Sequence, residues 1–350
     1  MEKFIINGGK KLKGEIKVSG AKNAALKIFP AAILSSGIIR VSNVPDIEDC
    51  RRAQEMLEIL GHRVEKNNSL TGETDGGGVF DLKPGGKVCS NLPANLVNKF
   101  RASVMFVGPL LATCGKVNFP HPGGCVIGAG TRPIDIFLDG FQKMGAKLKI
   151  LENHYCLEAK KLKGAEIFFP KITVTGTESL MMTATIAEGE TILKNCAMEP
   201  EIVELANFLN KIGAKISGAG TSIIKIKGVK KLGGGEYKVM PDRIEAGSFA
   251  IMAAAVKGSD VLIKNCEPKH LEALWSLFDK IGVNYKLGKD SIKIMPSKNL
   301  KATDMMTHEY PGFATDLQPP YVVLMTQAKG ASLIYEIIYE ISSDILSDSD

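Results

Sequence analysis

A glycine-rich loop at residues 120–133 (PHPGGCVIGAGTRP) places Cys125 between two pairs of glycines, and Arg132 follows near its end. A neighbouring guanidinium favours the thiolate form of a cysteine, and glycines give a backbone that can close over a ligand. Such a side chain can serve as a nucleophile or as a proton donor. Alternatively, Cys125 is one of seven cysteines that pack as small apolar residues, as we expect for Cys114 and Cys266. The residues alone leave both interpretations open.

Cations at the starts of apolar helices form a second group of candidate residues. Lys22 and Asn23 open the apolar stretch that runs to residue 34, and Arg101 opens the stretch 101–112. A cation at a helix N-terminus opposes the helix dipole unless an anion is bound there. Helix N-termini combined with Lys and Arg can therefore hold a phosphate or a carboxylate. For either cation taken alone, a solvated side chain is the favoured interpretation.

Carboxylates beside predicted helices form a third group. Asp316 lies in HEYPGFATDLQPP, at the start of a fifth apolar stretch. It could stabilise that helix N-terminus, or it could be a general base near a substrate hydroxyl. Glu199, Glu201 and Asp242 flank other predicted helices and could bridge repeats or domains.

Composition limits the classes of protein that these residues can belong to. The chain has 350 residues, 45% apolar and 23% charged, which excludes disorder and allows two or three domains. The longest apolar run, residues 103–115, is shorter than the roughly 20 residues of a membrane span. The net charge of +6 is spread along the chain, so a phosphate-bearing small molecule explains it as well as nucleic acid does.

Cysteine and histidine usage indicates the compartment. Seven cysteines without a CxxC pair, five histidines without ligand spacing and a start that has no apolar leader favour a reducing cytoplasm. We expect free thiols, no metal and no cofactor.

An internal repeat organises the chain. Each repeat consists of an apolar helix, a turn glycine, a strand, a second helix, a second glycine and a further strand. The two glycines are 24 residues apart in three repeats (37 and 61, 189 and 213, 258 and 282) and 30 apart in one (115 and 145). The longer repeat holds its extra residues in the Cys125 loop, and an insertion inside a repeat is typical of a functional loop.

The repeat predicts an α/β fold with the short apolar helices at the centre of each domain. A fifth repeat has its turn glycine at 330, and its second glycine would fall past the last residue. The segment after Glu340, ISSDILSDSD, cannot continue an amphipathic helix. We therefore expect a chain cut short within its fifth repeat.

Several motifs, in order, resemble the UDP-N-acetylglucosamine enolpyruvyl transferase family. They are SGAKNAAL, FRAS, PGGCVIG with RPID, EPEIVELANFLNKIGAKISGAGT, GGGEYKVMPDRIEAGSF and YPGFATDLQ. The resemblance extends from Met1 to Glu340 and implies a two-domain inside-out α/β barrel built from βαβαββ-like repeats, with the active site between the domains. We expect residues 22–240 to form the first domain, with a catalytic loop at 120–133, and residues 1–21 plus 241–350 to form a second, incomplete domain.

The resemblance also implies a reaction: transfer of the enolpyruvyl group of phosphoenolpyruvate to the 3-hydroxyl of UDP-N-acetylglucosamine, with release of phosphate. By resemblance, Lys22 and Arg132 hold phosphoenolpyruvate, and Asn23 and Arg101 lie near the ligands. Cys125 matches the proton donor that fosfomycin alkylates, and Asp316 matches the carboxylate beside the attacking hydroxyl. The remaining residues match segments that hold the UDP-sugar: Pro133, Ile134, Asp135, Ile136, Lys171, Ile172, Thr173, Val174 and Ile338.

Two alternatives accompany this hypothesis. The related shikimate-pathway transferases have no essential loop cysteine, so Cys125 argues against them. A catalytically dead, UDP-sugar-binding fragment is the other alternative, because relatives continue beyond Glu340 with two more arginines that bind phosphoenolpyruvate. Loss of such charge-assisted contacts predicts weak or absent activity for this chain. We expect no nucleic-acid or membrane partner.

Overall fold

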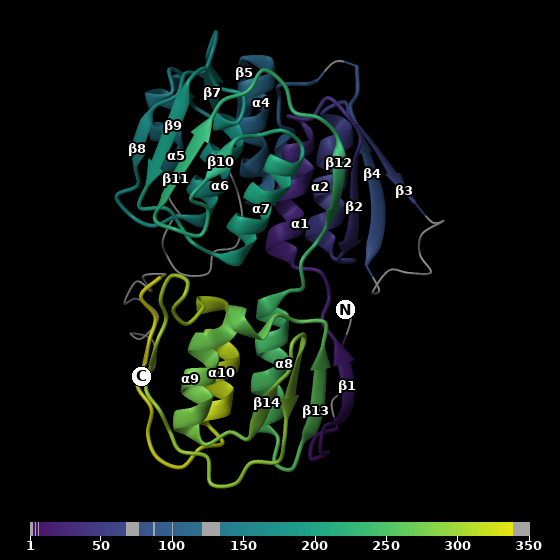
Figure 1. Ribbon diagram of the computed structural model, residues 1–350, viewed down its shortest axis with the longest axis vertical. Coiled ribbons are helices and arrows are strands. Elements are labelled where there is room, and N and C mark those ends of the chain that lie inside the picture. The colour runs from purple at the N-terminus through teal and green to yellow at the C-terminus, as the bar shows by residue number, and fades with distance from the viewer. Residues whose placement is uncertain are drawn as a thin grey trace. The chain divides into compact units, whose positions relative to one another are not determined.

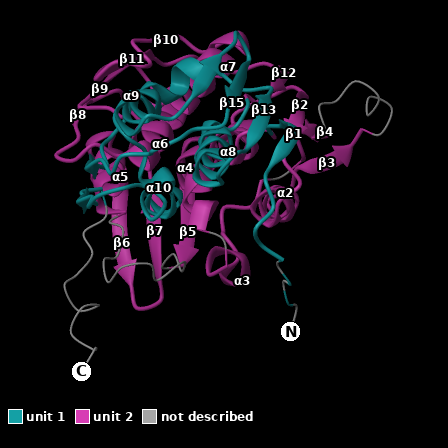
Figure 2. Cartoon of the chain, turned by 90° about the horizontal axis from the view of Figure 1, so that it is seen from below, with its two compact units in different colours: residues 1–18, 241–338 teal, residues 19–240, 339–350 magenta. Residues whose placement is uncertain are grey.

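The computed structural model describes residues 3, 5, 7–67, 77–86, 88–99, 101–120 and 134–338. These residues form two compact units, coloured separately in Figure 2. Unit 2 comprises residues 19–240, and unit 1 combines residues up to Val18 with residues 241–338. The domain boundaries expected from the sequence, at residues 22 and 241, stay a prediction about which parts fold independently.

Unit 2 contains three copies of the repeat. The elements of the first copy are α1 (Lys22–Ala32), β2 (Ile39–Val44), α2 (Glu48–Ile59), β3 (Arg63–Lys66) and β4 (Gly78–Lys83). Those of the second are α3 (Ala94–Val97), η2 (Arg101–Phe106), α4 (Val107–Cys114), β5 (Lys116–Pro120), α5 (Asp135–Lys143), β6 (Lys147–Leu151) and β7 (His154–Glu158). Those of the third are β8 (Glu166–Phe168), α6 (Val174–Ala184), β9 (Glu190–Lys194), α7 (Pro200–Lys211), β10 (Ile216–Ser217) and β11 (Ile223–Lys227), followed by β12 (Gly235–Lys238).

Each copy contributes one sheet to unit 2. The strand orders are β12-β2-β4-β3, β5-β7-β6 and β10-β11-β9-β8. Two sheets combine antiparallel neighbours with one parallel pair, β12 with β2 and β8 with β9. Buried Ile224 and Ile226 alternate along β11 with exposed residues, so each sheet has one face on the core and one in solvent.

The first helix of each repeat lies inside unit 2, and the sheets lie around it (Figure 1). Every residue of α1 from Ala24 onward is buried, and so is every residue of α6 from Gly176 onward. A helix that is apolar all round keeps its side chains out of water only when it is buried on all sides. This arrangement confirms the predicted inside-out α/β architecture for unit 2.

Unit 1 follows the same plan over fewer elements. They are β1 (Lys13–Lys17), α8 (Arg243–Ala255), β13 (Asp260–Lys264), η3 (Pro268–Leu271), α9 (Glu272–Ile281), β14 (Tyr285–Leu287), β15 (Ser291–Ile294), β16 (Met305–Met306), η4 (Thr315–Leu317), α10 (Gln318–Met325) and β17 (Ile334–Tyr335). One sheet has the order β1-β13-β15-β14, and β16 pairs with β17. The N-terminal strand β1 pairs in parallel with β13, with Lys13 opposite Asp260.

The central helices of unit 1 are less buried than the sequence predicts. Helix α8 packs against α10, but Met252 on α8 is 45% exposed and Val323 on α10 is 59% exposed. The prediction of burial on all sides was therefore wrong for these two helices. In unit 2 the corresponding helices pack against more helical neighbours, because α6 contacts α4, α5 and α7.

Glycines lie at the ends of helices and in the turns of the repeats, as predicted. The second glycine of each repeat has positive φ, between 85° at Gly282 and 114° at Gly213, which is the conformation that ends a helix at low cost. The first glycine of the first repeat, Gly37, does not lie in the left-handed region. It is required for space, since a Cβ there would lie 2.6 Å from the backbone nitrogen of Gly234.

The run 103–115 is not one continuous α-helix. It begins as the 3₁₀ helix η2 and becomes α-helical at Val107. Pro109 has no N–H and so cannot donate an α-helical hydrogen bond to the carbonyl of Met105. The segment before it therefore loses one of the bonds that would favour an α-helix over a 3₁₀ helix. Among the described residues, no helix is both long and apolar enough to cross a membrane.

Candidate functional site

The N-terminal end of α1 exposes Lys22 and Asn23. Ala21 precedes the helix and offers no side-chain cap to the amides of the first turn. Lys22 Nζ lies 2.7 Å from Asp49 Oδ2 at the start of α2, and the two side chains are 50% and 35% exposed. Uncapped amides beside a lysine can accept an anion. The anion would share Lys22 with Asp49.

The N-terminal end of α6 is built around Thr173. Its hydroxyl oxygen accepts a hydrogen bond from the Gly176 amide at 3.1 Å and so caps the helix. A Cβ at position 176 would lie 2.4 Å from Thr173 Cγ2, so this turn requires glycine. Lys171 before the cap is exposed, whereas Ile172 and Val174 are half-buried. The predicted UDP-sugar segment therefore forms an ordered helix start with the exposed cation of Lys171 beside it.

Two further predicted segments of unit 2 are described in part. Helix α5 begins at Asp135, which is exposed, with half-buried Ile134 and Ile136 on either side. Arg101 is half-buried and opens η2. The predicted residues Cys125, Arg132 and Pro133 lie outside the described residues.

In unit 1, Asp316 lies exposed in the short helix η4. The preceding Thr315 hydroxyl donates to Glu336 Oε2 at 2.7 Å, and the Ile338 amide donates to Glu336 Oε1 at 2.8 Å. Thr307 donates to the same carboxylate at 2.8 Å. Glu336 thus links the side chain of the residue before Asp316 to the backbone amide of Ile338.

A buried ion pair in unit 2 was missed from the sequence. Lys27 on α1 contacts Glu178 on α6, and their side chains are 9% and 0% exposed. A charged residue in the interior of each of two otherwise uncharged helix segments, 23–32 and 174–184, was the signal that could have revealed it. Burial raises the pKa of Glu178 to about 7, while the positive charge of Lys27 acts in the opposite direction.

Charged side chains in the first two turns of four helices of unit 2 interact with one another. Lys22 of α1 pairs with Asp49 in the first turn of α2. Lys27 pairs with Glu178 in the second turn of α6, and the charge of Glu201 in the first turn of α7 further raises the pKa of Glu178. Helix N-termini carry partial positive charge. Of these helix starts, that of α1 is the best suited to an anionic ligand, because it has no side-chain cap and has Lys22 beside it.

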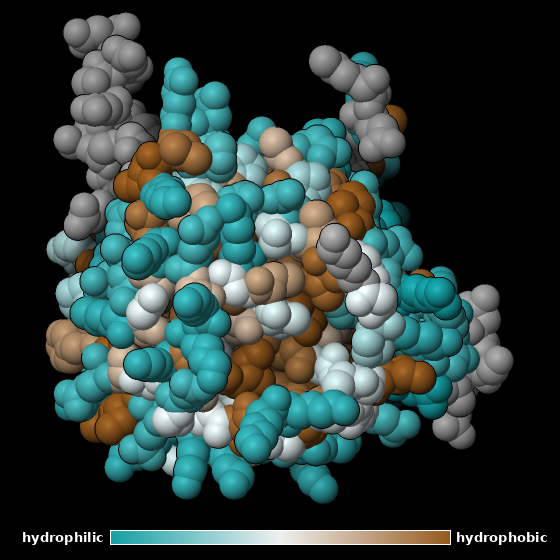
Figure 3. Space-filling view, turned by 90° about the horizontal axis from the view of Figure 1, so that it is seen from above, coloured by the Kyte–Doolittle hydropathy of each residue, from teal (hydrophilic) through white to brown (hydrophobic). Residues whose placement is uncertain are grey.

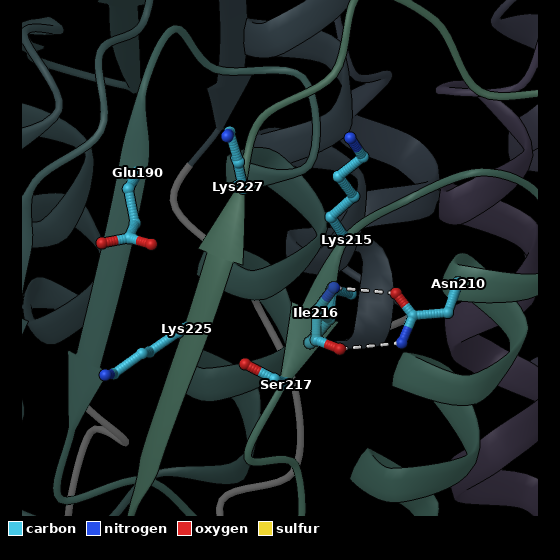
Figure 4. Close-up of a pocket in the computed structure, with 7 residues that line it drawn as sticks. All are labelled: Glu190, Asn210, Lys215, Ile216, Ser217, Lys225 and Lys227. Carbon is cyan, nitrogen blue, oxygen red and sulfur yellow. Dashed lines mark hydrogen bonds between the residues drawn. The ribbon is translucent and has the colours of Figure 1, made fainter.

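A hollow of about 380 Å³ lies elsewhere on unit 2, beside β9, β10 and β11 (Figure 4). Its lining includes Lys215, Lys225 and Lys227. The Asn210 side chain donates to the Ile216 carbonyl at 2.9 Å and accepts from the Ile216 amide at 2.8 Å, which ties β10 to α7. None of the predicted site residues lines this hollow. We assign Asn210 a structural role because of its two hydrogen bonds to the backbone of Ile216. Figure 3 shows one face of the molecule, on which hydrophilic residues predominate and apolar residues form smaller, separate patches.

The described cysteines are free thiols, and several are buried. Burial raises the pKa of Cys50 and of Cys196 to about 12, and that of Cys266 to about 11. These thiols are poor nucleophiles at neutral pH, as predicted for Cys266. Within the described part of the chain, no three His, Cys, Asp or Glu side chains are grouped to hold a metal ion.

Comparison with known proteins gives the chain a family context. The sequence family described as EPSP synthase (3-phosphoshikimate 1-carboxyvinyltransferase) matches residues 6–343. A UDP-N-acetylglucosamine 1-carboxyvinyltransferase from Koribacter versatilis is 43% identical over 97% of this chain and 77% of its own length. One with the same name from Geotalea uraniireducens is 46% identical over 97% of this chain and 79% of its own.

Solved structures support the fold. The enolpyruvyl transferase NikO from Streptomyces tendae has a TM-score of 0.82 at 20% identity, covering 95% of this chain and 76% of that one. EPSP synthase from Acinetobacter baumannii has a TM-score of 0.67 at 19% identity, covering 94% and 75%. At these identities the likeness concerns the fold alone, and it confirms the predicted fold class.

Proposed function

Since the chain belongs to the family of UDP-N-acetylglucosamine 1-carboxyvinyltransferases, within the wider EPSP synthase family, we propose that it transfers the enolpyruvyl group of phosphoenolpyruvate to the 3-hydroxyl of UDP-N-acetylglucosamine. Phosphate is released. Identity of 46% over 97% of the chain is the observation that carries this proposal. The product would serve peptidoglycan synthesis in the cytoplasm, and the reaction needs no cofactor.

The reaction proceeds by addition and then elimination. In the addition, the acceptor oxygen bonds to C2 of phosphoenolpyruvate, the acceptor hydroxyl loses its proton and C3 gains one. In the elimination, the bond from C2 to the phosphate oxygen breaks, and C3 loses a proton to restore the double bond. The chemistry requires a base at the hydroxyl, an acid at C3 and cations that hold the phosphate and carboxylate.

Residues of this chain match those requirements. We assign Asp316 as the base and Cys125 as the acid, and Lys22 and Arg132 as cations for phosphoenolpyruvate. The exposed carboxylate of Asp316 and the uncapped first turn of α1 beside Lys22 support the assignment. Asn23, Arg101 and the segments 133–136, 171–174 and 338 are assigned to the ligands as the resemblance implies.

A phosphate-release assay with phosphoenolpyruvate and UDP-N-acetylglucosamine tests the proposal. We expect release that depends on both substrates and is lost in Cys125→Ser, with Cys196→Ser as the matched control because Cys196 is buried. Release with 3-phosphoshikimate in place of the UDP-sugar would contradict the choice of acceptor. Binding of UDP-N-acetylglucosamine without turnover would support the dead-fragment alternative.

A further inference from the structure

The buried Lys27–Glu178 pair is energetically expensive for the fold. Both charges leave water, and an apolar pair of similar volume in such a place is often as stable or more stable. Glu178 Oε1 is also buried and has no hydrogen-bond partner. The neighbours of Glu178 do not all favour its charge, because Glu201, only 4% exposed, and Glu199 both act against its ionised form. Stability alone is therefore a poor reason for this pair.

The position of the pair along the two helices suggests another reason. Lys27 lies six residues after the N-cap position Ala21, and Glu178 lies five residues after the N-cap Thr173. At 1.5 Å per residue, their Cα atoms lie about 9 Å and about 7.5 Å along the helices from these positions. A contact between the two side chains therefore fixes how far the end of α1 lies along its axis relative to the end of α6.

Helix α7 reinforces this arrangement. It packs against both α1 and α6, and its first turn contributes Glu201, which is only 4% exposed. Glu201 and Glu199, at the N-cap position of the same helix, both disfavour a negative charge at Glu178. Lys27 supplies the positive charge that pairs with Glu178. Moving either helix along its axis would therefore separate charges that have no access to water.

We propose that Lys27 and Glu178 are positioning residues, whose buried ion pair holds the helix end bearing Lys22 and Asn23 at a fixed spacing from the helix end bearing Thr173 and Val174. Given the proposed function, these ends hold phosphoenolpyruvate and the UDP-sugar, so the pair controls affinity without touching a ligand. It is absent from the residues that the resemblance assigns to the site.

The test compares the wild-type chain with Lys27→Met, Glu178→Leu and the double variant. Each single variant leaves one buried charge alone, so we expect its Tm to fall by several degrees. In the double variant we expect the Tm to return to within a few degrees of wild type. Hydrogen exchange of the amides in α1 and α6 should nevertheless be at least tenfold faster, with α9 in unit 1 unchanged.

The second readout is the Kd for UDP-N-acetylglucosamine by calorimetry, which we expect to rise at least tenfold in the double variant. The matched control is Lys161→Gln/Glu188→Gln, which removes an exposed ion pair of the same unit and should change neither readout. Unchanged exchange in the double variant would overturn the positioning role, and so would faster exchange with an unchanged Kd. A wild-type chain that binds no UDP-sugar would refute the proposed function, while the exchange rates would still decide on positioning.

Discussion

Protonation of Glu178 should make the stability of unit 2 depend on pH. The perturbation is a pH change from 5.5 to 8. Burial raises the pKa of Glu178 from 4.5 to about 7 in the folded chain, while the unfolded chain keeps the ordinary value. Between these two values the folded state binds more protons than the unfolded state. Protonation of Glu178 therefore adds to the free energy of unfolding at low pH, and this stabilisation is lost as pH rises through about 7.

The magnitude follows from the two pKa values. At pH 5.5 the carboxyl of Glu178 is almost fully protonated in the folded chain and mostly ionised in the unfolded chain. By linkage, this difference adds about 2 kcal/mol to the free energy of unfolding, relative to a pH at which both are ionised. At pH 8 both are ionised, and the contribution is close to zero. The expected loss between these pH values is thus about 2 kcal/mol, a large part of an ordinary domain stability.

Urea unfolding followed by circular dichroism at intervals from pH 5.5 to 8 measures this dependence. Other groups titrate in the same range, including His62, whose pKa burial lowers. The double variant Lys27→Met/Glu178→Leu lacks both members of the pair but keeps His62, so the difference between the two curves isolates the pair. A difference that stays constant with pH, or that grows in favour of the wild type as pH rises, would refute the reasoning.

Three further predictions concern other described contacts. Asp49→Asn frees Lys22 from a half-exposed pair worth below about 1 kcal/mol, so the KM for phosphoenolpyruvate should fall by up to about fivefold in steady-state kinetics; a rise would contradict this. Asp242→Ala removes the N-cap that accepts two amide hydrogen bonds at the start of α8 and should cost about 1 kcal/mol in urea unfolding, whereas Asp242→Asn should cost less. Iodoacetamide at pH 8 should leave Cys196 unmodified when Cys125 is already labelled, as mass spectrometry of peptides would show; early labelling of Cys196 would argue against its burial.

Local signals in the sequence were sufficient for most of the fold. Helices end at Gly61, Gly145, Gly213 and Gly282 because positive φ there is a property of the glycine itself. Apolar composition was likewise sufficient to place α1 and α6 in a core. The requirement for glycine at position 37 was not visible, because it depends on a backbone segment almost 200 residues away.

The candidate site was less predictable. Lys22 and Asn23 could be proposed because a cation before an apolar helix is a local pattern. The partner of Lys22 could not, since Asp49 lies on another helix. Lys27 and Glu178 appear in the sequence as isolated charges 151 residues apart, and they become a pair only in the folded unit, where α7 packs against both α1 and α6. Pairings between distant segments need the tertiary structure.

The parallel pairing of β1 with β13 has a consequence for synthesis of the chain. Strand β1 cannot pair until the ribosome has synthesised β13, which begins at Asp260. Residues 19–240 of unit 2 are therefore translated between the two neighbouring strands of one sheet. At about 5 to 20 residues per second, the wait is on the order of 10 to 50 s. During this time β1 has an unpaired edge, the kind of surface that recruits other strands and invites aggregation. Three of its five residues are lysine or glutamate on the exposed side, and such charges protect a nascent strand until its partner emerges from the ribosome.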